Sequence, residues 1–226
     1  MVGALRTAES TPVGGMLLSH VWPACIFALP LGVRVWGLLH ASRDGSLYAQ
    51  AALLQEVVSV VFLAQVVVLF VVRRRSLRGE HSTFVPGLVA LLGTFALTGV
   101  AYLPVSATTS TEALLASSLV IIVGTLWTIW SLAALGRCFG MFAEVRGFVT
   151  SGPYRLVRHP VYLGEVVSAV GLLLVKPTAV IVLGFAVFVG LQYWRALFEE
   201  HALSRVFPYE YPVYARRVSR FIPGRR

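Results

Sequence analysis

Long apolar runs constrain this chain more than any other feature of its sequence. They lie at 17–39, 50–72, 86–105, 113–135, 161–175 and 178–194. A helix needs about 20 apolar residues to cross a ~30 Å hydrocarbon core, and the first four runs reach that length. Only 13% of the residues are charged, whereas soluble domains carry about 25%. We therefore predict an all-α, polytopic membrane bundle with about six transmembrane segments.

The last two runs predict a short helical hairpin at the C-terminal side. Lys176 and Pro177 separate them, and proline ends a helix because it lacks the amide hydrogen and its ring clashes with the preceding turn. At 1.5 Å per residue the two helices measure roughly 23 to 26 Å, slightly less than a full crossing. Their outer ends face the same side of the membrane whether or not they cross it.

Basic residues predict the orientation of the bundle. Of the 19 Lys and Arg residues, sixteen lie in the two terminal segments and in the segments 73–81 and 136–160, whereas the opposite loops hold only Arg43 and Lys176. Cytoplasmic loops are enriched in Lys and Arg, so we predict that both termini are cytoplasmic. The net charge of +9 then reflects topology, and nucleic acid is not expected as a partner.

The sequence predicts neither a disulfide nor a metal site. Cys25 lies inside an apolar run and Cys138 in a distant basic segment, so we do not expect them to pair. His201 has no neighbour at convincing metal-ligand spacing. We expect this histidine to face solvent.

Two polar segments, 136–165 and 194–226, are predicted on the cytoplasmic side. Because the hairpin joins them, we expect them to lie together. Residues 1–135 then form four N-terminal transmembrane helices, and residues 136–226 form a core with the hairpin and a cytoplasmic tail. Aromatic residues interleave with arginines in that tail, which predicts a helix lying in the membrane interface.

The polar residues just before the fifth run predict an anion pocket. Pro160 suits the first position of a helix, where its missing amide hydrogen costs nothing. The free amide groups of that helix start point toward whatever lies beside His159. With Arg155 and Arg158 they make a partly positive pocket, suited to a carboxylate or a phosphate.

Four neighbouring residues add to this pocket. Tyr154 and Tyr162 offer flat faces for a base or a cation. Gly164 allows a close approach to the helix, and Glu165 is a charge inside a membrane segment, which marks a functional candidate. The alternative is that the arginines and tyrosines only anchor the helix at the interface.

The tail offers a second group of charges. Arg195 and Glu199 are i,i+4 neighbours on a helix and can pair, and Glu200 follows directly. The alternative here is a surface ion pair that contributes little stability.

Both polar segments carry a family resemblance. The stretch GPYRLVRHPVYLGE resembles the Gly-Pro-Tyr-Arg-x-x-Arg-His-Pro-x-Tyr-x-Gly signature of the isoprenylcysteine carboxyl methyltransferase and phospholipid methyltransferase superfamily. The tail, from Arg195 through the Glu pair to the closing Arg-Phe-Ile-Pro, is similar to that family's second signature. Where the family usually has Phe-Gly, this chain has Phe207-Pro208. The resemblance covers about 136–224.

The resemblance implies a site and a cofactor. It implies S-adenosylmethionine as the methyl donor, held at the cytoplasmic surface under the tail. The implied cofactor-binding residues are Tyr154, Arg155, His159, Pro160, Tyr162, Gly164 and Glu200, and the implied catalytic residues are Arg195 and Glu199. The implied partners are membrane lipids and a lipophilic acceptor that enters from the bilayer.

The reacting group of the acceptor stays open at this point. A methyl sulfonium is already activated, so its transfer needs alignment more than a strong base. A carboxylate acceptor needs no deprotonation, and Arg195 can orient it. An amine acceptor needs a base, for which Glu199 is the nearest candidate.

Two other functions are compatible with the sequence. Distantly related membrane reductases of isoprenoid or sterol-like lipids share a similar C-terminal hairpin and use NADPH. A membrane scaffold of the same fold would have lost the chemistry and would bind neither cofactor. The chain has no Gly-x-Gly-x-x-Gly loop, so we expect any cofactor to be held by the pocket at the membrane surface.

Overall fold

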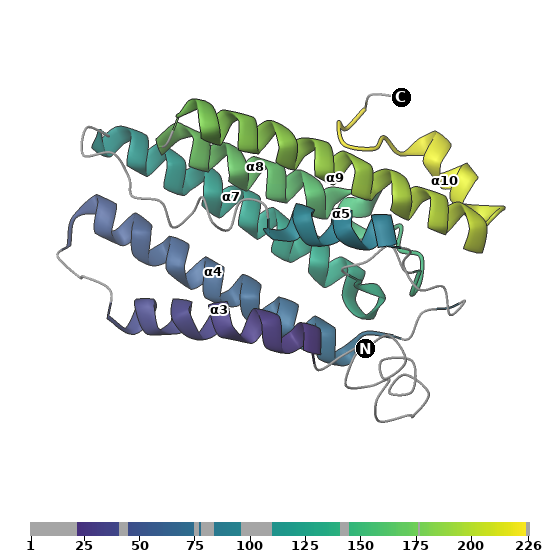
Figure 1. Cartoon of the computed structure of the whole chain (residues 1–226), viewed down its shortest axis with the longest axis horizontal. Helices are drawn as coiled ribbons and strands as arrows, with labels where there is room; N and C mark the ends of the chain where they lie inside the picture. The colour runs from purple at the N-terminus through teal and green to yellow at the C-terminus, as the bar shows by residue number, and fades with distance from the viewer. Residues whose placement is uncertain are drawn as a thin grey trace.

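The described part of the chain is a bundle of helices. The computed structural model describes residues 22–40, 45–74, 77, 84–95, 110–140, 145–175 and 177–224. Its helices are α3 (Trp22–Leu39), α4 (Leu47–Val72), α5 (Phe84–Phe95), α7 (Thr111–Leu135), α8 (Pro160–Val175), α9 (Ala179–Val206) and α10 (Glu210–Arg217), with 3₁₀ turns η2 (Gly136–Cys138) and η3 (Gly152–Arg155). The long helices run side by side in Figure 1. The prediction of an all-α membrane bundle is confirmed.

Each predicted apolar run overlaps one of these helices. Three of them, α4, α7 and α9, are long and apolar enough to cross a membrane, whereas α3, α5 and α8 are shorter apolar helices. The third run extends past α5 into residues outside the described ranges. The protein is an integral membrane protein, and the number of six crossings stays a prediction.

Helix α9 is longer than the hydropathy pattern predicts. The apolar run ends at Trp194, but the helix continues to Val206, for a length of roughly 42 Å. The residues after Trp194 are mostly Ala, Leu, Glu and Arg, which are strong helix formers, and the next breaker is Pro208. The prediction of a separate interfacial helix is therefore wrong for residues 195–206, and only α10 is a separate helix.

Helices α7 and α8 pack closely because glycines face each other. A Cβ atom added at Gly164 would lie 2.8 Å from the carbonyl oxygen of Gly124 and 2.9 Å from Cδ1 of Trp127. The indole Nε1 of Trp127 donates to the carbonyl of Pro160, at 2.9 Å. Small residues let membrane helices approach in this way. Gly164 therefore serves the contact between two helices, and the close neighbour is α7.

The other helices complete the bundle around this pair. Helix α3 packs on α4, α4 packs on α7, and α5 lies along α9 (Figure 1). A buried apolar cluster fills the junction of α3, α4 and α7, and it consists of Ala24, Val66, Leu69, Phe70 and Leu132.

Two basic segments meet at one end of the bundle. The amide of Arg74 donates to the carbonyl of Arg137 at 2.8 Å, and the amide of Leu77 donates to the carbonyl of Val145 at 2.8 Å. The guanidinium of Arg146 donates to the carbonyl of Arg74. The loops that were predicted to share one side of the membrane are thus in contact.

Candidate active site

A cavity lies where α7, α8 and α9 meet α10 and the segment before η3. The empty space of the cavity, counted together with its open mouth, is about 1000 Å³, of which about 150 Å³ is accessible to the centre of a water-sized group. Its polar end is lined by Tyr154, Arg158, His159, Tyr162, Glu165, Arg195, Glu199, Tyr211 and Tyr214. Its apolar wall includes Phe27, Phe62, Val66, Leu132, Leu135 and Val161. The cavity therefore combines a charged end with a hydrocarbon surface.

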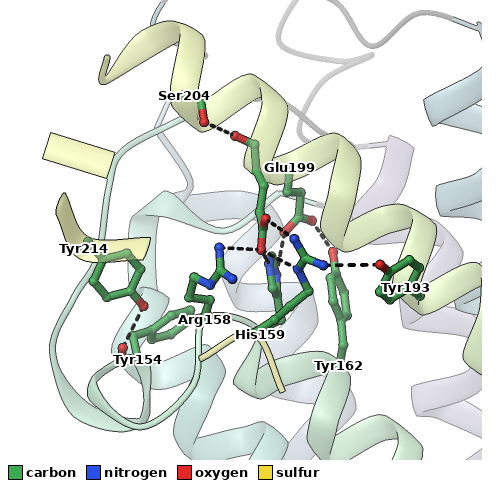
Figure 2. Close-up of polar contacts among 10 residues, drawn as sticks. Tyr154, Arg158, His159, Tyr162, Tyr193, Glu199, Ser204 and Tyr214 are labelled. Carbon is green, nitrogen blue, oxygen red and sulfur yellow. Dashed lines mark hydrogen bonds and ion pairs between the residues drawn. The ribbon is translucent and has the colours of Figure 1, made fainter. Parts of the chain in front are cut away.

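Tyr162 links the two residues that were predicted to be catalytic. Its hydroxyl donates to Oε1 of Glu199, and the guanidinium carbon of Arg195 lies 4.7 Å from the centre of its ring. The second oxygen of Glu199 lies 3.7 Å from Nδ1 of His159. In Figure 2, His159 and Tyr162 project from the start of α8 toward Glu199 on α9. Arg195 and Glu199 thus share one aromatic residue in the cavity.

Glu200, which does not line the cavity, contacts three cationic side chains. Its Oε1 lies 3.0 Å from Nε2 of His159 and 3.1 Å from Nη1 of Arg158. Arg220 donates to both of its oxygens, at 2.9 and 2.7 Å. Such two-bond contacts between Arg and a carboxylate are strong and directional. Glu200 therefore holds the ring of His159 in place and links the C-terminal segment to α9.

Backbone contacts hold the same C-terminal segment against the start of α8. The amide of Arg158 donates to the carbonyl of Ser219 at 2.8 Å, and the amide of His159 donates to the carbonyl of Arg220 at 3.2 Å. The hydroxyl of Tyr214 donates to the carbonyl of Tyr154 at 2.7 Å (Figure 2). The predicted proximity of the two polar segments is confirmed.

The surroundings of His159 favour its charged form. Burial lowers the pKa of this histidine, but its hydrogen bonds to Glu199 and Glu200 outweigh burial, so that its pKa lies above 6.5. Burial also raises the pKa of Tyr154, and it raises the pKa of Tyr211 to about 12. Both phenols therefore remain protonated donors at neutral pH.

The predicted site residues fall into two groups. Those that line the cavity are Tyr154, His159, Tyr162, Arg195 and Glu199, and those that do not are Arg155, Pro160, Gly164 and Glu200. Arg155 is exposed because it ends the η3 turn, whose Pro153 and Tyr154 face inward. Arg158, one turn further on, faces the cavity instead. Pro160 is the first residue of α8, as predicted.

Three residues of this region were missed by reasoning on the sequence. Gln192, on α9, is 1% exposed and bonds to Arg195 and Glu165. A lone glutamine inside an apolar run was a usable signal, because polar residues in membrane segments mark functional sites. The roles of Arg220 and Tyr214 gave no such signal, since they depend on the fold of the tail.

Other predictions concern cysteine, histidine and metal. Cys25 and Cys138 are both free, and His201 is exposed, as predicted. Among the residues that the structure describes, no group of three His, Cys, Asp or Glu side chains could hold a metal ion.

The fold and the cavity define an integral membrane protein with a cavity at the junction of a helical hairpin and its C-terminal tail. The phospholipid methyltransferase family profile matches residues 112–210, from α7 to the start of α10. In this region the chain is similar to phospholipid methyltransferases and to isoprenylcysteine O-methyltransferases.

Individual relatives show the same similarity. Protein-S-isoprenylcysteine O-methyltransferase A of Arabidopsis thaliana is 33% identical over 115 residues, 46% of this chain and 56% of the relative. Form B of the same plant is 31% identical over 113 residues, 46% of this chain and 55% of the relative. The nickel-cobalt-cadmium resistance protein NccN of Alcaligenes xylosoxydans xylosoxydans is 40% identical over 76 residues, 33% of this chain and 35% of the relative. The match thus spans about half the length of the two plant proteins.

Proposed function

We propose that this protein is an S-adenosylmethionine-dependent methyltransferase that acts on a lipophilic acceptor. The observation that carries the proposal is the group formed by Arg195, Tyr162, Glu199 and His159, which lines a cavity with an apolar wall. The match of residues 112–210 to the phospholipid methyltransferase family profile supports the reaction class. The acceptor is a lipid-like carboxylate or amine, and the basic segments beside the cavity favour a cytoplasmic position for this end of the bundle.

The residues of the cavity fit the proposed cofactor. The rings of Tyr154, Tyr211 and Tyr214 suit a purine, and Arg158 suits a carboxylate. The carboxylate of Glu199 and the ring face of Tyr162 both favour a nearby positive charge. When bound, S-adenosylmethionine supplies a methyl group on a cationic sulfur, which is already activated for transfer.

The chain's own residues orient the acceptor and control protons. Arg195 presents a planar guanidinium that can hold a carboxylate through two bonds. Glu199 accepts the hydroxyl hydrogen of Tyr162, and it is positioned to take a proton from an amine. The apolar wall, with Phe27, Phe62 and Val66, excludes water and suits a hydrocarbon chain.

Binding and transfer experiments test the proposal. The purified protein in lipid nanodiscs should bind S-adenosylhomocysteine in a calorimeter. It should also pass labelled methyl from S-adenosylmethionine to N-acetyl-S-farnesylcysteine or to phosphatidylethanolamine. Arg195→Ala should abolish transfer, whereas Arg216→Ala, at an exposed position of α10, should not. Binding of NADPH without S-adenosylhomocysteine would support the reductase, and binding of neither would support the scaffold.

The predicted orientation has its own test. A single reporter cysteine at Arg216 should react with an impermeant reagent only from the cytoplasmic side. Reaction from the outside would contradict a cytoplasmic site.

A further inference from the structure

Gln192 is a buried polar residue in the middle of an apolar helix. It is 1% exposed, and it lies one helical turn before Arg195 on α9. Burying an amide away from water is costly unless both of its ends are bonded. Its contacts therefore indicate why a polar side chain occupies this place.

Both ends of the Gln192 amide are bonded to charged residues. Its Nε2 donates to Oε2 of Glu165 on α8, and its Oε1 accepts from Nη1 of Arg195 at 3.0 Å. An amide donates through its NH₂ group and accepts through its oxygen. Gln192 can therefore bridge a carboxylate and a guanidinium that do not touch each other. Glu165 and Arg195 both line the cavity, and Gln192 holds them in a fixed relation.

Helix α5 encloses the same arginine from a third direction. A Cβ atom added at Gly93 would lie 2.8 Å from Cδ of Arg195 and 3.2 Å from Oε1 of Gln192. The next residue, Thr94, lines the cavity. The side chain of Arg195 thus passes between the backbone of α5 and the ring of Tyr162, with its end bonded by Gln192.

We propose that Gln192 and Glu165 are positioning residues that fix the guanidinium of Arg195 for the acceptor. The proposal rests on the proposed function, because it assigns Arg195 to the acceptor. Gln192 sets the rotation of the guanidinium plane, and Glu165 sets the orientation of the amide by accepting from its NH₂ group. If Glu165 did not accept from the NH₂ group, the amide of Gln192 could rotate and direct that group toward Arg195. The NH₂ group and the guanidinium are both hydrogen-bond donors, so they would not bond.

A reciprocal exchange of the two residues tests the proposal. Gln192→Glu places two carboxylates against each other, and Glu165→Gln leaves two amides. The double variant Glu165→Gln/Gln192→Glu again has one carboxylate and one amide, with the carboxylate next to Arg195. The measurement is kcat/KM for methyl transfer to whichever of N-acetyl-S-farnesylcysteine and phosphatidylethanolamine the wild-type protein methylates.

The expected result is a loss in the single variant and recovery in the double. Gln192→Glu should lose about 10- to 100-fold in kcat/KM, the range expected for a hydrogen bond to a charged group. The double variant should return to within about 5-fold of wild type, since residues in one network are not additive. If the two single losses simply multiply, the proposal is wrong.

Two further measurements separate positioning from structural support. When Arg195 is replaced by Lys, the substitutions at Gln192 and Glu165 should change kcat/KM by less than about 2-fold. Lysine has no planar guanidinium for these two residues to orient. The affinity for S-adenosylhomocysteine should stay unchanged in every variant.

As a matched control, Gln65→Leu removes another interhelical amide bond, to the carbonyl of Ile129 at 3.0 Å, and should lower the melting temperature without changing kcat/KM. An exchange effect of equal size in the Arg195→Lys background overturns the proposal.

A second variant covers the case in which Gln192→Glu does not fold. Gly93→Ala crowds the flexible side chains of Arg195 and Gln192 but keeps the chemical groups of Gln192 and Glu165, so the fold can absorb it. It should lower kcat/KM by about 10-fold through displacement of the guanidinium, and an unchanged value overturns the proposal. If the wild-type protein neither binds S-adenosylhomocysteine nor transfers methyl groups, the proposed function fails instead.

Discussion

The contacts of Glu200 make its charge important for stability. Its carboxylate faces three cationic groups, on Arg158, His159 and Arg220, within 2.7 to 3.1 Å. Its side chain is 12% exposed. The variant Glu200→Gln keeps the shape of the side chain and removes the charge, so it isolates the electrostatic contribution.

The size of the effect follows from the burial of the partners. Removing one partner of a buried ion pair costs about 3–5 kcal/mol, whereas an exposed pair contributes about 1 kcal/mol or less. The side chain of His159 is 4% exposed and that of Arg158 is 15% exposed, so we expect about 3 kcal/mol for Glu200→Gln. In a chain of this length that corresponds to a melting temperature about 6 to 12 °C lower. Arg220→Ala should cost only about 1 kcal/mol, because Glu200 keeps its two other partners.

Thermal unfolding in detergent at neutral pH measures both variants. The control is Glu210→Gln, which removes an exposed carboxylate from the first turn of neighbouring α10 and should cost less than about 1 kcal/mol. A melting temperature for Glu200→Gln equal to that of the control would refute the argument. It would mean that the three cations are stabilised by solvent and not by Glu200.

Three further predictions concern pH, helix packing and an ion pair within the bundle. Because the pKa of His159 is raised above 6.5, its charge stabilises the fold fully below that pH, and this stability is lost as pH rises through the raised pKa. The melting temperature should therefore fall as the pH rises above about 6.5, and an equal fall in His159→Gln would contradict this origin. Gly164→Ala should cost about 1–3 kcal/mol in unfolding experiments through overpacking against α7, whereas Gly190→Ala, with open space around it, should be neutral or stabilising. Glu56→Gln should be more destabilising than the double variant Arg34→Gln/Glu56→Gln. The single variant leaves Arg34 charged without the carboxylate of Glu56, which lies 2.6 Å from its Nη1. A double variant less stable than the single variant would contradict this prediction.

Hydropathy predicts where the helices lie better than where they end. The apolar runs locate every long helix, because burying apolar side chains in lipid requires a closed backbone hydrogen-bond pattern. Ser46, Ser110 and Thr178 cap the starts of α4, α7 and α9, as helix propensities lead one to expect. The end of α9 is different, since its last turns are polar and continue until a helix breaker, Pro208, is near.

The motif predicts a candidate site, but it does not show which of its residues face the cavity. Arg155 and Arg158 are the same residue type three positions apart, and the η3 turn alone decides that the second faces inward. Gly164 likewise belongs to the motif, although its missing side chain makes room for α7. Residue type and spacing do not distinguish contact with a ligand from contact with a helix.

The two networks around the site depend on pairs of segments that are distant in sequence. Glu200 and Arg220 are 20 positions apart, and Glu165 and Gln192 are 27 positions apart. Neither spacing corresponds to the repeat of a single helix, so no local pattern predicts these contacts. They result from the turn of the hairpin and from the return of the tail over α8.

The glycine contacts between α7 and α8 also affect how such a cavity can diverge. The two helices touch through backbone atoms at Gly124 and Gly164, so almost any larger side chain there would separate them and disturb the charged end of the cavity. The opposite wall, from α3 and α4, presents Phe27 and Phe62, and side chains of this kind can be replaced by others of different size. Substitutions in α3 and α4 should therefore change what the cavity accommodates with less disturbance than substitutions at the contact between α7 and α8. Transplanting α3 and α4 between related proteins would then transfer a preference for one hydrocarbon shape over another.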